Sequence, residues 1–181
     1  AGIDWDWKSA ADFAAQLDSL PLACNIALQV GHGAVRIAVM GFDNRPPTGA
    51  ELERMRGLIA AAMEEGAVGF SSGLIYSPSG YSATEELVAL ADVAGRFGGF
   101  YSSHIRGEGV TLLDSVNEAI RVGREAHIPV QLSHHKAVDE PNWGKTQRSL
   151  GLIDQERAEG IDVLADQYPD RKSTRLNSSH V

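Results

Sequence analysis

The sequence has few of the residues that mark several large classes of proteins. Among its 181 residues is a single cysteine, Cys24, so no intrachain disulfide can form and a reducing compartment is the natural expectation. It contains no run of 18 apolar residues, and its first residues, AGIDWDWKSA, lack the basic and apolar regions of a signal peptide. These absences predict a cytoplasmic protein that does not span a membrane.

Basic residues are also scarce. Lysine and arginine number 16 against 24 acidic residues, which gives a formal net charge of -8 and a pI of about 5.2. A nucleic-acid-binding domain normally presents a basic face, so we expect neither a nucleic acid nor a membrane surface as partner. The apolar content of 43% is sufficient for one domain with a core. The sequence sets no expectation about the oligomeric state.

Segments with strand and helix patterns alternate along the chain. Buried apolar runs of strand length are followed by amphipathic segments long enough to cross over to a parallel neighbour. No Gly-x-Gly-x-x-Gly motif follows the first strand, which disfavours dinucleotide binding. The pattern predicts an α/β fold and is compatible with either a TIM barrel or an open doubly wound sheet. The expected strands are 25–30, 67–73, 100–105, 129–135 and 161–169, and the expected helices are 8–20, 50–65, 84–98, 111–127 and 143–160.

Short polar residues mark the expected starts of three helices. Ser9 and Thr84 are predicted caps, and Thr48 with Glu51 has the spacing of a capping box. These signals fix the N-terminal ends of the helices more sharply than the apolar periodicity does.

Other residues receive structural expectations. Gly31-His32-Gly33 is predicted to turn the chain after the first strand; His32 is expected to serve this turn, the alternative being that it faces the active end. Cys24, at the start of that strand, is expected in the core. His127 is expected at a helix end, and His135 is expected on the opposite strand face from His134, in packing or in support of a ligand.

Two histidines hold matching places in consecutive strand–helix units. His104 closes FYSSH and His134 follows PVQLS, 30 positions later, and both come after a serine. If the strands are neighbours in a parallel barrel, both imidazoles face the same mouth, where they could share a metal ion. Two ligands are too few for zinc, so others must come from elsewhere; Asp166, at the end of the last strand, is a candidate ligand or base. The alternative is that each residue is an ordinary polar residue at a strand end.

Further polar side chains are expected at the rim of this mouth. Arg106 and Lys136 each lie two residues beyond a histidine, where a cation could pair with a substrate carboxylate or remain a solvated loop charge. Tyr76 and Tyr168 could donate a phenolic hydroxyl to a substrate oxygen. Glu108 could orient a ligand, pair with Arg106, or have no special role.

Several strings together resemble one family. The strings GFSSGLIYSPSGYSATEELVALADVAGRFGGFYSSHIRGEG, PVQLSHHKA, NWGK and DVLADQYP, with GHGAVRIAVMG earlier in the chain, are similar to the N-acyl-D-amino-acid deacylases (D-aminoacylases) of the amidohydrolase superfamily. The resemblance extends from residue 1 to about 169. The ordered combination of these strings makes it specific.

The resemblance implies a partial (β/α)8 TIM barrel, with about four to five β/α units in residues 1–170. It implies zinc (Zn2+) as cofactor and hydrolysis of the amide bond of an N-acyl-D-amino acid to a carboxylate and a D-amino acid. By the same resemblance, His104 and His134 match zinc ligands, while four residues match positions near the substrate: Tyr76, Arg106, Lys136 and Tyr168.

The sequence also departs from the family pattern. The family's early His-x-His motif and ligand cysteine are missing, Cys24 does not match that cysteine, and the aspartate that serves as general base is expected beyond residue 170. Residues 171–181 are polar and aperiodic and are expected to be foreign sequence or a disordered tail. We therefore expect an internal fragment that is inactive alone. The alternatives are another amidohydrolase reaction, on a cyclic amide or a dipeptide, or a non-catalytic α/β binding module.

Overall fold

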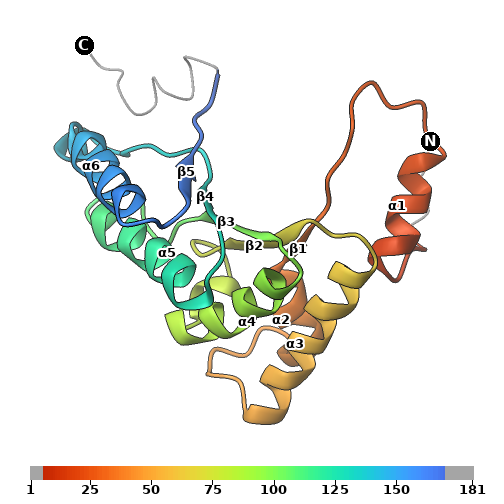
Figure 1. The fold of residues 1–181 in the computed structure, drawn as a ribbon. Coiled ribbons are helices and arrows are strands. Elements are labelled where there is room, and N and C mark those ends of the chain that lie inside the picture. The colour runs from red at the N-terminus through yellow and green to blue at the C-terminus, as the bar shows by residue number, and fades with distance from the viewer. Residues whose placement is uncertain (1–5, 170–181) are drawn as a thin grey trace.

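The five strands lie in the sheet in the same order as in the chain. The computed structural model describes residues 6–169, and within them all neighbouring strands pair in parallel (Figure 1). A doubly wound sheet reverses its strand order at a switch point, so the observed order is that of an arc of a (β/α) barrel, as expected. The strands are β1 (Gln29–Gly31), β2 (Gly69–Gly73), β3 (Phe100–His104), β4 (Val130–Leu132) and β5 (Val163–Ala165).

The strand register brings the carboxyl ends of the middle strands to one edge. Gly73 is the partner of His104, and Ser103 is the partner of Leu132. Residues that follow β2, β3 and β4 therefore emerge beside one another, although about 60 positions of sequence separate the first from the last. This edge corresponds to the face on which barrel enzymes carry their active sites.

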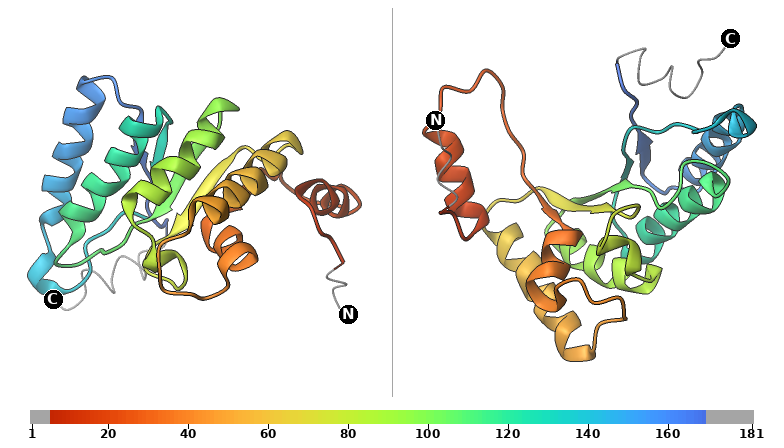
Figure 2. Two further views of the ribbon diagram at one scale, coloured as in Figure 1. Left: turned by 90° about the horizontal axis from the view of Figure 1, so that it is seen from below. Right: turned by 180° about the vertical axis from the view of Figure 1, so that it is seen from behind.

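Helices α2 to α6 cover one face of the sheet, and α3, α4, α5 and α6 lie side by side (Figure 2). The core lies between these helices and the strands, with Phe70, Tyr101 and Leu132 of the sheet fully buried. The helices are α1 (Ala10–Asp18), α2 (His32–Met40), α3 (Gly49–Glu64), α4 (Thr84–Arg96), α5 (Leu112–Ala126) and α6 (Lys145–Ala158), with short 3-10 turns η1 (Ser79–Tyr81) and η2 (Glu140–Asn142).

Two of the three predicted helix starts are confirmed. The Ser9 side chain accepts a hydrogen bond from the backbone N–H of Asp12, and Thr48 and Glu51 form a complete capping box. The prediction for Thr84 was wrong: Ala83 occupies the cap position and Thr84 is already helical. The Thr84 hydroxyl instead donates to Glu118 on α5, a partner that only the tertiary structure supplies.

The expected turn at Gly31-His32-Gly33 was also wrong, because His32 begins α2. Gly33 in the first turn and the short length of nine residues weaken the helical signal in the sequence. Burial decides the conformation instead: His32, Val35, Arg36 and Met40 are buried along one face of the helix. His127, in contrast, does lie at a helix end, as the left-handed C-cap of α5.

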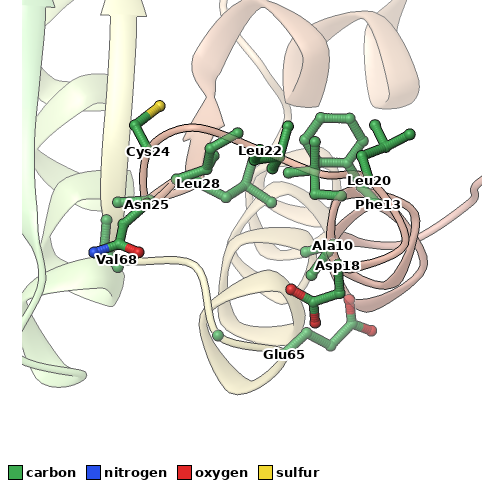
Figure 3. Close-up of a pocket in the computed structure, with 15 residues that line it drawn as sticks. Ala10, Phe13, Asp18, Leu20, Leu22, Cys24, Asn25, Leu28, Glu65 and Val68 are labelled. Carbon is green, nitrogen blue, oxygen red and sulfur yellow. The ribbon is translucent and has the colours of Figure 1, made fainter.

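The segment before β1 differs from the prediction as well. The strand covers only 29–31, and Cys24 is exposed rather than in the core. Helix α1 stands apart from the other helices and borders a groove of about 450 Å³, which Phe13, Leu22 and Val68 help to line (Figure 3). This groove lies where the chain enters β1 and β2. It is therefore at the opposite strand ends from the histidines, a face that contributes to stability in barrels rather than to chemistry.

The last two strands are shorter than the expected 129–135 and 161–169, so His134 and Asp166 lie in the connections that follow them. The tail predicted for 171–181 lies outside the described residues. Within residues 6–169, none of the helices combines the length and hydrophobicity needed to cross a bilayer.

Candidate metal centre

Two imidazole rings meet at the carboxyl edge of the sheet. His104 is the last residue of β3 and His134 follows β4 by two residues. Nδ1 of His104 lies 2.8 Å from Nε2 of His134, and the ring centroids are 4.4 Å apart. This contact is a hydrogen bond between the rings and is shorter than the roughly 3.3 Å between two nitrogens that share a tetrahedral zinc ion, so the rings would separate slightly to hold one. The expected convergence of the rings is confirmed; that they bind a metal stays a prediction.

The backbone of His134 adopts an unusual conformation that its neighbours support. Its φ of 42° lies in the left-handed region, which costs a non-glycine residue roughly 1–2 kcal/mol. The His134 N–H donates to Oδ1 of Asp166 at 2.7 Å, and Nζ of Lys136 donates to the His134 carbonyl at 3.1 Å. Asp166, a candidate ligand or base by sequence, is here an acceptor that orients the histidine.

Glu108 is the third group at the centre. It is 8% exposed, and its Oε1 lies 3.3 Å from Nδ1 of His134 and 3.9 Å from Nε2 of His104. One donor atom from each of these three residues lies within 4.8 Å of the other two. Glu108 also forms an ion pair with the Lys136 ammonium, so of the alternatives that the sequence left open, pairing with Arg106 is not the one observed.

The electrostatics suit metal binding. Burial lowers the pKa of His104, which favours the neutral imidazole that can donate a lone pair. Nε2 of His104 is buried and has no hydrogen-bond partner among the described residues. Two imidazoles and a carboxylate form a donor set that zinc accepts. An unsatisfied ring nitrogen beside two further donors therefore fits a zinc ion.

Aromatic rings extend the centre on both sides. The Tyr76 ring lies 5.2 Å from that of His104, and the Tyr168 ring stacks on His134 at 5.3 Å. The Lys136 ammonium lies 5.3 Å from the centroid of the Tyr168 ring. The structure thus gathers three of the four residues that were expected near a substrate around the two histidines.

Arg106, the fourth, has other partners. Its guanidinium donates to Glu118 on α5 and to the carbonyls of Gly80 and Ser82 in the loop after β2. Sequence reasoning did not identify Glu118, because an acidic residue in the middle of an amphipathic helix carries no signal of such a role.

A buried charged cluster lies next to this loop. Nη1 of Arg36 donates to both carboxylate oxygens of Glu86, and His32 contacts Glu86 through Nε2 at 2.9 Å and Ser79 through Nδ1 at 3.0 Å. His32 and Arg36 are fully buried, and these contacts satisfy most of the polar atoms that would otherwise be costly to bury, except Nε of Arg36. His135 is held outside the centre, where its Nε2 lies 2.8 Å from Oγ of Ser149 on α6, and burial lowers its pKa.

Comparisons with known proteins agree with this geometry. A D-aminoacylase from Alcaligenes xylosoxydans xylosoxydans is 38% identical over 168 residues, which cover 93% of this chain and 34% of the relative. An N-acyl-D-glutamate deacylase from the same organism is 43% identical over 145 residues, 80% of this chain and 30% of the relative. No family model matches the chain.

Solved structures give the same relationship. The N-acyl-D-glutamate deacylase from Bordetella bronchiseptica, complexed with zinc and a phosphonate inhibitor, superposes with a TM-score of 0.85 at 37% identity, over 90% of this chain and 34% of that one. A D-aminoacylase described as defining a novel subset of amidohydrolases also has a TM-score of 0.85, at 36% identity over the same shares. A D-hydantoinase, at 14% identity and a TM-score of 0.56, shares only the fold.

The chain spans about a third of the length of the relatives that it matches. Over that length the strand order, the paired histidines and the sequence identity coincide, and the chain belongs to the D-aminoacylase family of amidohydrolases.

Proposed function

We propose that this chain forms part of a zinc-dependent hydrolase that cleaves the amide bond of N-acyl-D-amino acids and releases a carboxylate and a D-amino acid. The observation that carries the proposal is the convergence of His104 and His134 at the carboxyl edge of the sheet, in a chain of this family. An amide needs activation of both its carbonyl and the attacking water. A bound zinc ion supplies the Lewis acidity for that activation.

In this proposal His104 and His134 hold the ion. Glu108, with one oxygen near both rings, completes the donor set or orients the rings toward the ion. Asp166 holds the backbone of His134 in place. Because the general base is expected beyond residue 170, the chain alone is not expected to turn over substrate.

The substrate carboxylate is assigned to Lys136. Its ammonium contacts Glu108, Nδ1 of His134 and the His134 carbonyl and lies over the Tyr168 ring, so a substrate carboxylate would replace one of these contacts beside the centre. Tyr76 and Tyr168 flank the rings on either side and are assigned to the walls that receive the acyl and amino-acid parts. A cytoplasmic location belongs to the same proposal, supported by the single cysteine.

Zinc binding is the first test, and it uses the 181-residue chain. Titration followed by calorimetry is expected to give saturable zinc binding that His104→Ala and His134→Ala each abolish. His127→Ala is the matched control, because His127 lies at the far end of α5 and is expected to leave binding unchanged. If the unchanged chain and the three variants bound zinc equally well, His104 and His134 would not be zinc ligands and the proposal would lose its metal.

Activity is the second test. In a hybrid deacylase, the 168 aligned residues of this chain replace their counterparts in the Alcaligenes D-aminoacylase. The hybrid is expected to hydrolyse N-acetyl-D-amino acids, and His104→Ala is expected to remove that activity. Hydrolysis of cyclic amides or dipeptides in place of acyl-D-amino acids would contradict the proposed substrate class, and a folded, zinc-loaded hybrid without any hydrolysis would contradict the reaction.

A further inference from the structure

The loop between β2 and α4 (residues 74–83) carries one wall of the proposed site. Tyr76 lies in this loop with its ring against His104, yet its side chain remains largely exposed at 62%. Within the loop, Gly80 N–H donates to the Tyr76 carbonyl at 2.8 Å and Tyr76 N–H donates to Gly73 at 3.0 Å. Packing does not fix a ring that is this exposed. The position of the Tyr76 ring therefore depends on the contacts that anchor the loop.

Arg106 provides one anchor. Its Nη1 donates to the Gly80 carbonyl at 2.8 Å and its Nη2 to the Ser82 carbonyl at 2.9 Å. Nε and Nη2 also donate to the two carboxylate oxygens of Glu118, at 2.9 Å each. Glu118 accepts a further hydrogen bond from Thr84 at the start of α4. The guanidinium therefore ties the loop to α5.

His32 provides the second anchor, from the opposite side. A neutral ring that donates from Nε2 to Glu86 can accept at Nδ1 from the Ser79 hydroxyl, 3.0 Å away. His32 is fully buried and Arg36 pins the same Glu86 carboxylate, so the ring has no freedom to turn. The loop is thus held at Ser79, which lies three residues beyond Tyr76, and at Gly80 and Ser82 after it.

These contacts leave Arg106 poorly able to bind a substrate. A guanidinium has five N–H donors, and a bidentate clamp on a carboxylate needs two neighbouring ones. Four of the five are directed at Glu118, Gly80 and Ser82, which leaves one N–H on Nη1. We propose that Arg106 is a positioning residue, which together with Glu118 and His32 fixes the β2–α4 loop and so holds Tyr76 against His104, without contacting the substrate.

The anchoring can be tested in the 181-residue chain by hydrogen–deuterium exchange, independently of any activity. Arg106→Lys keeps the charge but loses the planar fork, and Glu118→Gln and Ser79→Ala each weaken one anchor. Each is expected to speed amide exchange in 74–82 by about tenfold or more beyond any increase that β3 and α5 share through the lower overall stability. Lys136→Met is the control and is expected to leave the loop unaffected. Unchanged exchange in 74–82 for Arg106→Lys and Glu118→Gln would overturn the proposal.

The catalytic consequence rests on the proposed function and is measured in the hybrid deacylase with two substrates, an N-acetyl-D-amino acid and its carboxamide. Arg106→Lys and Glu118→Gln are expected to lower kcat about 10- to 100-fold by the same factor for both substrates, with zinc content unchanged. Lys136→Met is expected to raise KM more for the carboxylate substrate than for the carboxamide. An Arg106→Lys loss confined to the carboxylate substrate would show direct substrate binding and overturn the proposal. If the hybrid were inactive while loop exchange responded, the proposed function would fail and the anchoring would stand.

Discussion

The ends of β3 and β4 share a sequence pattern and use it differently. Each has a serine, a histidine, one further residue and a cation: Ser103 to Arg106 after β3, and Ser133 to Lys136 after β4. After β3 the histidine is still in the strand and the cation turns to α5 and the neighbouring loop. After β4 the histidine has a left-handed backbone and the cation folds back onto it.

The acceptors within reach account for this difference. Arg106 meets a carboxylate on α5 and two carbonyls that a planar fork can bind together. Lys136 meets Glu108 and the His134 carbonyl, which suit a compact ammonium. The same spacing therefore yields a structural cation in one unit and a candidate substrate partner in the next. Identical local patterns do not fix function; the tertiary acceptors do.

The largest effect is expected from Glu108, which belongs chemically to the β4 end although it follows β3 in sequence. Glu108→Gln removes the buried negative charge between Lys136 and the two rings and is expected to weaken zinc binding 10- to 100-fold. Calorimetric titration with zinc measures the affinity of the variant. The exposed Glu140→Gln is the matched control, and equal affinity of the two variants would mean that Glu108 neither binds nor orients.

The next largest effect is expected on stability when the cation types at Arg106 and Lys136 are exchanged. Arg106→Lys is expected to destabilise the chain by about 1–2 kcal/mol, because an ammonium cannot satisfy Glu118 and both carbonyls together. Lys136→Arg is expected to change stability less than Arg106→Lys does, because a guanidinium keeps the positive charge that pairs with the buried Glu108. Urea unfolding followed by circular dichroism gives both values, and a reversed order would contradict the assignment of the structural role to Arg106.

A smaller effect is expected at the acceptor that holds His134. Asp166→Asn keeps an oxygen that can accept from the His134 N–H but removes the charge. We expect a loss of about 0.5–1 kcal/mol in urea unfolding and a severalfold weaker zinc affinity. Asp162→Asn, on the same segment but before β5, is the control. A larger loss in the control would show that the effect belongs to the strand and not to the histidine.

The smallest effect is expected from a partly exposed pair, Arg45 and Glu51, far from both strand ends. Hydrogen bonds from Arg45 and Thr48 hold the pKa of Glu51 well below its ordinary value. A depressed pKa means that the pair stabilises the fold above the unfolded value near 4.5 and that this contribution falls as the pH drops below it. Glu51→Gln should therefore flatten the pH dependence of stability between about pH 5 and 2, measured by urea unfolding, and an unaltered slope would exclude this origin.

The sequence carried enough signal for the alternating α/β pattern and for the meeting of His104 and His134, because strand ends in a parallel sheet share one edge. It did not carry the partners of Arg106. Those are main-chain carbonyls of a loop whose shape depends on a buried histidine in another helix. Helix α2 was missed for a related reason: Gly33 in its first turn argues against a helix, and the burial of His32 and Arg36 against Glu86 outweighs it.

Glu108 shows the same limit at the centre itself. Glu108 lies four positions after His104, and pairing with Arg106 was as plausible in sequence as a role beside the rings. Only the fold reveals that α5 supplies a different carboxylate for Arg106, which frees Glu108 for the histidines. Whether Arg106 pairs with Glu108 or with Glu118 is decided by how α5 packs, and the sequence pattern does not contain that information.

The order β1-β2-β3-β4-β5 has a consequence for engineering. Since each strand pairs with the next one along the chain, contacts are short in sequence and no connection has to be threaded beneath another. A donor segment can therefore be joined to a host barrel at any loop between two units, with new hydrogen bonds required only along the flanks of β1 and β5. The same two flanks are the surfaces to protect, with a charged or proline-bearing edge, if this arc is to be kept monomeric at high concentration.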